Sequence, residues 1–178
     1  MMLQMISLLV ENKPGALMRV TGVLTARGYN IESLTVARTI DPEVSCMSIV
    51  VGIEPHQRGQ LIKQMNKLIN VLKASDVTEA RAVRRELALV RVLVSRENRG
   101  AILKEAEIFG ARPVDSSLEG FALEATGDPE KLDEFIAVMA AYGEIEVTRS
   151  GLVAVSLEVK KLKLAPPVSK VEGVAQNG

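Results

Sequence analysis

Polar and small residues interrupt an apolar run near the start of the chain, in the stretch VENKPGAL at residues 10–17. A loop that leaves a strand and opens a helix exposes unpaired backbone N–H groups at the positive end of the helix dipole, which suits a carboxylate or phosphate. Gly15 would let a ligand approach the backbone closely, and the Asn12 side chain can both donate and accept hydrogen bonds. Together these groups suit a small zwitterion such as a free amino acid.

A second asparagine, Asn30, stands at the start of a segment that alternates like a strand, and we expect the sheet to bring it near the same pocket. Plainer interpretations stay open, and from the residues alone they are favoured. Asn-x-Pro-Gly is also what an ordinary strand-to-helix turn requires, with Asn12 as the N-cap and Pro14 in the first turn. Asn30 follows Gly28 closely enough to be an ordinary helix-exit residue.

The other reactive residue types form no catalytic or metal-binding constellation in the sequence. Cys46 lies in a strand-like segment, where a small buried hydrophobe is the favoured interpretation, and His56 has no second His nearby. The sequence contains no Walker-type phosphate loop, no Cys or His cluster and no serine elbow. We therefore predict no catalytic residue, no metal site and no cofactor in this chain.

Composition argues against several classes of function. The chain has 22 basic and 22 acidic residues, three Phe, two Tyr and no Trp, so nucleic acid is a poor candidate partner. A single cysteine excludes an intrachain disulfide, and no apolar run approaches the ~20 residues that cross a bilayer. The start of the chain lacks the pattern of a signal or transit peptide, so we expect a soluble, cytoplasmic protein.

Apolar periodicity predicts the order βαββαβ for the first half of the chain. The expected elements are a strand from residue 4 to about 10, a helix from 16 to 27, a strand hairpin over 31–39 and 45–53, a helix whose apolar face runs over 61–72, and a strand over 71–77. The segment 31–39 becomes an edge strand of an antiparallel sheet. It has no proline and no central lysine to block pairing, so homodimerisation edge to edge is a natural outcome.

The second half repeats this order. Its expected elements are a strand over 87–94, a helix over 99–109, a weak strand over 111–117, a strand around 121–125, a helix after Asp128-Pro129 and a strand over 144–149. The stretch EN-R-GAI at 97–102 echoes ENKPGAL with one residue deleted, which favours a duplicated domain. We therefore predict an α+β protein with two tandem βαββαβ ferredoxin-like domains.

The polar stretch TEARAVRR separates the two dense apolar blocks and is interpreted as a linker. The predicted divisions are a domain at 1–77, the linker at 78–85, a second ferredoxin-like domain at 86–157 and a flexible tail at 158–178. The segment after Gly151 begins as a plausible strand before the tail.

The run ISLLVENKPGALMRVTGVLTARGYNIESLTVARTIDPEVSCMSIVV closely resembles the small regulatory subunits of acetohydroxyacid synthase, also called acetolactate synthase. ENKPGAL, RGYNIESLTVA and the DP turn carry the resemblance most specifically. It continues through LVRVLVS, EIFGARPVD and the RSG near residue 150, and so covers nearly all of residues 4–155.

The resemblance implies an N-terminal ACT domain that dimerises side by side, and a C-terminal ACT-like domain. It also implies a subunit without activity of its own, which activates a catalytic subunit of the transferase class and confers feedback inhibition by valine or another branched-chain amino acid such as isoleucine. Thiamine diphosphate, Mg and FAD are expected in the catalytic subunit. The family's effector site corresponds here to Asn12, Gly15, Ala16, Asn30 and Ile31.

The second copy of the loop is one residue shorter and has no counterpart of Asn30, so we do not expect it to hold an amino acid in the same way. Two alternatives to a regulatory subunit remain at this stage. One is a free-standing amino-acid-sensing ACT protein that acts on a transcription or transport partner. The other is a small enzyme on the same scaffold, since a fold does not fix a function.

Overall fold

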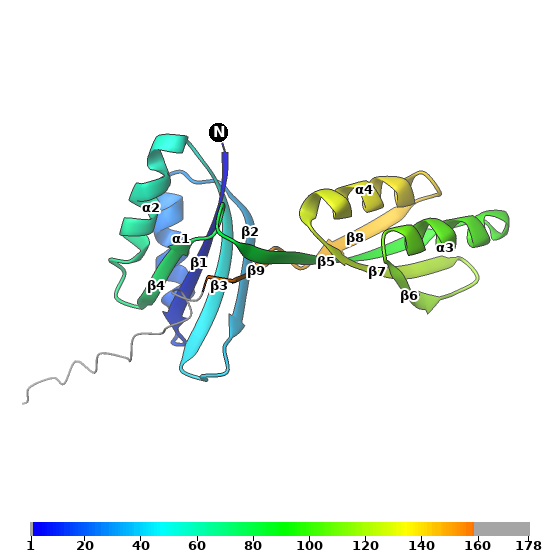
Figure 1. The fold of residues 1–178 in the computed structure, drawn as a ribbon. Helices are drawn as coiled ribbons and strands as arrows, with labels where there is room; N and C mark the ends of the chain where they lie inside the picture. Colours follow the sequence, from blue (N-terminus) through cyan, green and yellow to red (C-terminus); the bar gives the residue numbers. More distant parts are fainter. Residues whose placement is uncertain (1, 159–178) are drawn as a thin grey trace, which may run out of the picture.

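The computed structural model of the chain describes residues 2–158, and Figure 1 shows their fold. The first half contains β1 (Met2–Glu11), α1 (Ala16–Ala26), β2 (Ile31–Arg38), β3 (Val44–Ile53), the short 3-10 helix η1 (Pro55–Gln57), α2 (Arg58–Met65) and β4 (Val71–Asp76). The predicted order βαββαβ is confirmed. The four strands form one antiparallel sheet in the order β2-β3-β1-β4, so β2 is an edge strand, as predicted.

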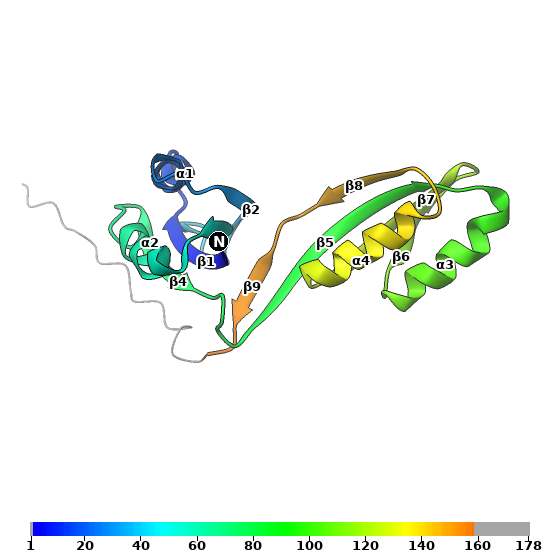
Figure 2. The ribbon, with the colours of Figure 1, turned by 90° about the horizontal axis from the view of Figure 1, so that it is seen from above.

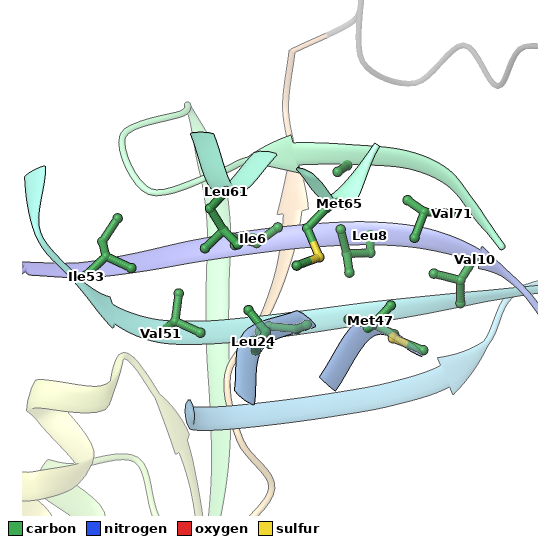
Figure 3. Packing of buried hydrophobic residues seen from close by; sticks show 13 residues of the cluster. Ile6, Leu8, Val10, Leu24, Met47, Val51, Ile53, Leu61, Met65 and Val71 are labelled. Atoms are coloured by element: carbon green, nitrogen blue, oxygen red, sulfur yellow. The ribbon is translucent and has the colours of Figure 1, made fainter. Parts of the chain in front are cut away.

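The helices α1 and α2 cover one face of this sheet, and the first hydrophobic core lies between the helices and the sheet (Figure 3). Every second residue of β1 and β3 enters this core, since successive side chains of a strand point to opposite faces. The largest fully buried members are Ile6, Leu8, Leu24, Met47, Ile49, Ile53, Leu61 and Met65.

The predicted helix face over 61–72 is too long, because α2 ends at Met65. The Asn66 side chain accepts the Ala74 N–H at 2.9 Å and donates to the Ile62 carbonyl at 3.1 Å. These bonds fix the turn from α2 into β4. Ile69 and Leu72, counted as part of the apolar helix face, are exposed instead.

The second half contains β5 (Ala82–Leu93), the short 3-10 helix η2 (Arg96–Asn98), α3 (Arg99–Ile108), β6 (Arg112–Ser116), β7 (Gly120–Gly127), α4 (Pro129–Ala140), β8 (Ile145–Arg149) and β9 (Val153–Ser156). Its sheet runs in the order β6-β7-β5-β8, which repeats the order of the first sheet. The second core is built around Phe135, which α4 supplies, and around Ile102 from α3. The tandem ferredoxin-like fold is thus confirmed.

A two-stranded ribbon connects the two units, as Figure 2 shows. The first four residues of β5 pair with β9, while the rest of β5 lies in the second sheet. Residues 82–85, the second half of the predicted linker, are therefore strand. Arg84 donates hydrogen bonds to the carbonyls of Val77, Thr78 and Ala80, so its side chain is bonded to the end of the first unit.

The ribbon packs on the face of the first sheet that the helices leave open. A small apolar cluster joins them, with Met5, Val50 and Val77 against Leu152 and Ala154. Beyond Glu158, the tail predicted to be flexible lies outside the described residues.

Candidate functional site

The loop between β1 and α1 occupies residues 12–15 and ends at a glycine whose backbone is left-handed. Gly15 has φ +83 and ψ −9 and stands at the N-cap position of α1. A β-carbon there would meet no heavy atom within 4 Å, so backbone conformation alone demands glycine, while the space around it is open. The loop therefore combines a helix N-terminus with room for a small ligand.

Asn12 does not cap α1, contrary to the plain turn interpretation. Its backbone N–H donates to the Glu43 carbonyl at 2.7 Å, and its side-chain Nδ2 donates to the Pro42 carbonyl at 2.8 Å. Both acceptors belong to the turn between β2 and β3. The side chain thus ties the loop to that turn through its amide nitrogen, and its amide oxygen remains as an acceptor for a ligand.

The first turn of α1 begins with a bond inside the loop. The Ala16 N–H donates to the Lys13 carbonyl at 3.2 Å, at the long end of the normal range, and the Arg19 N–H donates to the Gly15 carbonyl at 3.0 Å. Ala16 is nearly fully buried, and Pro14 has no N–H to offer. The donors available to an anion are therefore fewer than the sequence suggests.

Charged and amide side chains surround the base of this loop. The Asn70 Nδ2 donates to Glu11 at 2.7 Å and the Lys13 ammonium lies 3.3 Å from the same carboxylate. These hydrogen bonds, that from Asn70 first, hold the pKa of Glu11 below its ordinary value. Arg19 donates to the Asn70 Oδ1 at 2.8 Å, so two cations lie near the helix N-terminus, where they favour a bound anion.

Asn30 and Ile31 lie at the start of β2, at the other end of the sheet. The Asn30 carbonyl accepts the Gly52 N–H at 3.2 Å, and its side-chain Nδ2 donates to the Glu32 carboxylate. Ile31 pairs with Val51 and is partly buried against the first core. Within one chain, then, the expectation that the sheet brings Asn30 near the Asn12 loop is not met.

The second copy of the loop differs in backbone and in contacts. Gly100 lies inside α3, and the left-handed glycine of the first copy has no equivalent there among the described residues. The Arg99 guanidinium lies 4.2 Å from the centre of the Phe121 ring and donates to the Ser117 carbonyl at 2.8 Å. An arginine held by these two contacts therefore lies at the start of this helix, directly before Gly100.

The other reactive residues are dispersed. Cys46 is a half-buried free thiol on β3, and His56 lies in the short helix η1. Within residues 2–158, no three His, Cys, Asp or Glu side chains are grouped so that they could hold a metal ion. None of the helices in that range is long and apolar enough to cross a membrane.

Comparisons with known proteins match both halves of the chain. A family model described as the AHAS small subunit-like ACT domain matches residues 6–73, and one described as the small subunit of acetolactate synthase matches residues 85–158. The chain belongs to the acetolactate synthase small-subunit family.

Relatives and a solved structure agree with this assignment to the small-subunit family. A probable acetolactate synthase small subunit from Archaeoglobus fulgidus is 48% identical over 88% of this chain and 98% of its own length. The acetolactate synthase small subunit from Mycolicibacterium smegmatis is 45% identical over 85% of this chain and 89% of its own. The crystal structure of the Thermotoga maritima small subunit superposes with a TM-score of 0.78 at 34% identity, over 88% of this chain and 98% of that one.

Sequence reasoning missed the contacts that join the two units of this small subunit. Ser33 and Thr35 on β2 bond to the bend between β8 and β9 and so join the two units. Within the second unit, Arg149, directly before the bend, bonds to Glu86 and Asp133. The available signal was the RSG at 149–151, which had served only to extend the family resemblance.

Proposed function

We propose that this chain is the non-catalytic regulatory subunit of acetohydroxyacid synthase. It binds the thiamine-diphosphate-dependent catalytic subunit, raises its activity and makes it sensitive to valine or another branched-chain amino acid. The observation that carries the proposal is the match to the small-subunit family in both halves of the chain. Thiamine diphosphate, Mg and FAD belong to the catalytic partner in this scheme.

The effector site is completed by a second copy of the chain, because its two halves lie at opposite ends of one sheet. Of the two edge strands of the first sheet, β2 is the more open to that pairing. β4 carries Lys73, a residue type that discourages strand pairing, whereas β2 has no proline and no lysine. A homodimer through β2 follows.

Antiparallel pairing of β2 with its symmetry copy supplies the missing half. A two-fold axis across the edge sets the start of one β2 beside the end of the other. The end of β2 lies beside the turn that holds Asn12, since the Thr39 N–H donates to the Val44 carbonyl at 2.9 Å and Asn12 bonds to Pro42 and Glu43. The partner's Asn30 and Ile31 thus approach the loop of the first chain.

The chemistry of this two-chain site fits an α-amino acid. The effector carboxylate binds the N–H groups at Gly15 and in the first turn of α1, close to Lys13 and Arg19. If it recruits the Ala16 N–H, it displaces the long bond to the Lys13 carbonyl. The ammonium group meets amide oxygens of the two asparagines, and the isopropyl group of valine lies between the protomers beside Ile31.

Reconstitution tests this function. Adding the chain to the catalytic subunit of the same enzyme should raise acetolactate formation, and valine, leucine or isoleucine should then lower it. Gly15→Asp puts a carboxylate where that of the effector binds, so inhibition should disappear while activation persists. Gly22→Asp, which adds the same charge at an exposed glycine of α1, is the matched control and should remain inhibited.

Affinity capture distinguishes the alternative of a free-standing sensor. Immobilised full-length chain should retain a large thiamine-diphosphate enzyme from a cell extract. Retention of a DNA-binding or membrane transport protein in its place would support the free-standing sensor and contradict the proposal. Retained inhibition in Gly15→Asp would refute the site while leaving the regulatory role intact.

A further inference from the structure

The middle of β2 holds a bend of the C-terminal unit through two hydroxyl groups. The Leu152 N–H donates to the Ser33 Oγ at 2.9 Å, and the Thr35 Oγ1 donates to the Ser150 carbonyl at 3.2 Å. The bend, residues 150–152, lies between β8 and β9. We call these two bonds and the bend they hold the β2 clamp.

Residue 151 lies between the two bonded residues of the bend, and only glycine fits there. Its φ is +82, and a β-carbon there would come within 2.7 Å of the Thr35 Oγ1 and 2.8 Å of the Ser33 Oγ. At Gly15, Gly28 and Gly110, which also have positive φ, a β-carbon would meet nothing within 4 Å. Close approach of two units, and not backbone conformation alone, therefore requires glycine at 151.

The bend is also joined firmly to the C-terminal unit. Three residues of the bend stand opposite two residues of β5, because Arg149 pairs with Ala88 and Val153 pairs with Arg85. The extra residue makes a bulge, which reverses the faces to which β8 and β9 direct their side chains. The Leu87 N–H donates to the Ser150 Oγ at 3.1 Å, and the Ser150 N–H donates to the Leu87 carbonyl at 2.9 Å.

A charged network continues from the bend to a helix. Arg149, the residue before the bend, donates to both carboxylate oxygens of the buried Glu86 at 2.8 and 2.7 Å. It also donates to Asp133 on α4. A displacement of β2 relative to the other strands of the first sheet would thus be passed through the bend to β8 and α4.

A second set of contacts holds the ribbon on the first unit away from β2. This set includes the small apolar cluster around Met5 on β1, Val50 on β3 and Val77 just after β4. It also includes the hydrogen bonds from Arg84 to the carbonyls of Val77, Thr78 and Ala80. None of these residues lies on β2. Two hydrogen bonds therefore hold the bend on the edge strand β2, whereas apolar packing and the Arg84 bonds hold the ribbon on β1, β3 and the segment after β4.

We propose that the β2 clamp transmits effector binding at the dimer edge to the C-terminal unit, an inference that rests on the two-chain effector site proposed above. β2 begins at Ile31, directly after Asn30, and both residues belong to the proposed effector site; the clamp residue Ser33 follows two positions further on. An effector between two β2 edges changes the position of the strand, and the clamp moves the bend with it. Ser33 and Thr35 are positioning residues in this scheme. β2 and the bend that it holds form the element whose position changes when the effector binds.

The test removes both hydroxyls and keeps the effector residues. The double variant Ser33→Ala, Thr35→Val should bind valine in calorimetry of the full-length dimer as the unchanged chain does, and should still activate the catalytic subunit. Its half-inhibitory valine concentration should rise by about tenfold or more, within the range of ordinary allosteric couplings. Gly151→Ala, which keeps both hydroxyls but forces them away, should behave in the same way.

Two matched variants control for packing. Thr35→Ser keeps the hydroxyl and should keep normal inhibition, whereas Thr35→Val keeps the shape and should weaken it. Ser7→Ala removes a hydroxyl from the same face of the sheet two strands away, and should also keep normal inhibition. Thermal unfolding of each variant identifies any loss of folded protein.

A distance measurement adds a readout that does not depend on activity. With Cys46→Ser as background, spin labels at the exposed positions Thr25 on α1 and Lys104 on α3 report the separation of the two units. Valine should shift the distance distribution in the background protein and leave it unchanged in the double variant.

Each outcome has a distinct meaning. Normal inhibition in the folded double variant would overturn the clamp, and so would loss of valine binding by its dimer, since the hydroxyls would then belong to the effector site. If the unchanged chain neither bound nor responded to any branched-chain amino acid, the proposed effector function would fail, and the clamp with it.

Discussion

Asn12 and Asn30 lie at opposite ends of one four-stranded sheet. Asn12 bonds to Glu43 beyond one end of β3, and Asn30 bonds to Gly52 near the other. The extended chain from Glu43 to Gly52, most of it β3, separates these two bonds by nine residue steps, which is about 30 Å. An amino acid that contacts both asparagines must therefore bind between two chains.

Mixed dimers should recover a binding site that neither parent variant has. In a dimer with two-fold symmetry, each site takes Asn12 from one chain and Asn30 from the other. Asn12→Ala and Asn30→Ala dimers should each fail to bind valine. After unfolding and refolding of an equal mixture, half of the dimers are mixed and each has one intact site, so calorimetry should recover about a quarter of the sites.

The mixing experiment can also contradict the two-chain site. A site built within one chain, or one that needs only one of the two asparagines, would give no recovery on mixing. Mixing Asn12→Ala dimers with Gly15→Asp dimers is the control, because both changes lie in the same half of the site and no intact site can form.

Blocking the β2 edge should give monomers. Thr39 bonds inward to Val44, so by the alternation of an antiparallel strand the Val36 N–H points to the open edge. Val36→Pro removes that donor without removing a bond to β3, and should shift the chain to the monomer mass in light scattering. Val36→Thr keeps the donor and should stay dimeric. A dimer that persists in Val36→Pro would indicate another interface.

The sequence predicted the fold well because both halves have strong local patterns. Alternation in β3 and in Phe121, Leu123 and Ala125 of β7 gave the strands, and the duplication gave the order. The sequence could not reveal the end of α2, since Asn66 ends that helix through bonds to Ala74, a residue eight positions further on. A helical pattern continued through Ile69 and Leu72, although tertiary structure left them exposed.

The candidate site was predictable only in part. The motif at Asn12 and Gly15 is local, and the left-handed Gly15 agrees with it. The position of Asn30 depends on strand direction: the crossover through α1 leaves β2 parallel to β1, so β2 begins at the end of the sheet away from Asn12. Ser33 and Thr35 gave no signal, since their partners lie more than a hundred residues away.

Acid should destabilise the first unit through Asp76. Burial by itself would raise the pKa of Asp76, but hydrogen bonds from Arg58, Thr78 and Gln4 outweigh burial and hold the pKa at about 2. A carboxyl pKa below its unfolded value of 3.8 gives stability that is complete above about pH 4 and lost as the pH falls towards 2.

Replacing Asp76 tests this assignment. Asp76→Asn should lower the free energy of unfolding at pH 7 by about 1–3 kcal/mol, the usual loss for a hydrogen bond to a charged group. The variant should also lose part of its dependence on pH between 4 and 2 in urea titrations. Glu79 is the other carboxylate partner of Arg58, and its side chain is 75% exposed. Glu79→Gln should therefore change the free energy of unfolding by less than about 1 kcal/mol. Equal effects of the two substitutions would contradict the assignment.

Arg149 should stabilise the protein mainly through its buried partner Glu86, and much less through its exposed partner Asp133. The Glu86 side chain is only 8% exposed, so Arg149→Met leaves a buried carboxylate without its bidentate partner, at a cost of about 3–5 kcal/mol. Asp133 is 63% exposed, and Asp133→Asn should cost less than about 1 kcal/mol.

Removing both members of the buried pair separates charge burial from packing. Glu86→Leu in the Arg149→Met background should restore much of the lost stability, because an apolar pair replaces a buried ion pair at little cost. Urea unfolding followed by circular dichroism gives the four free energies of the double-mutant cycle. If the double variant is less stable than Arg149→Met alone, packing around the bend, and not the unpaired charge, explains the loss.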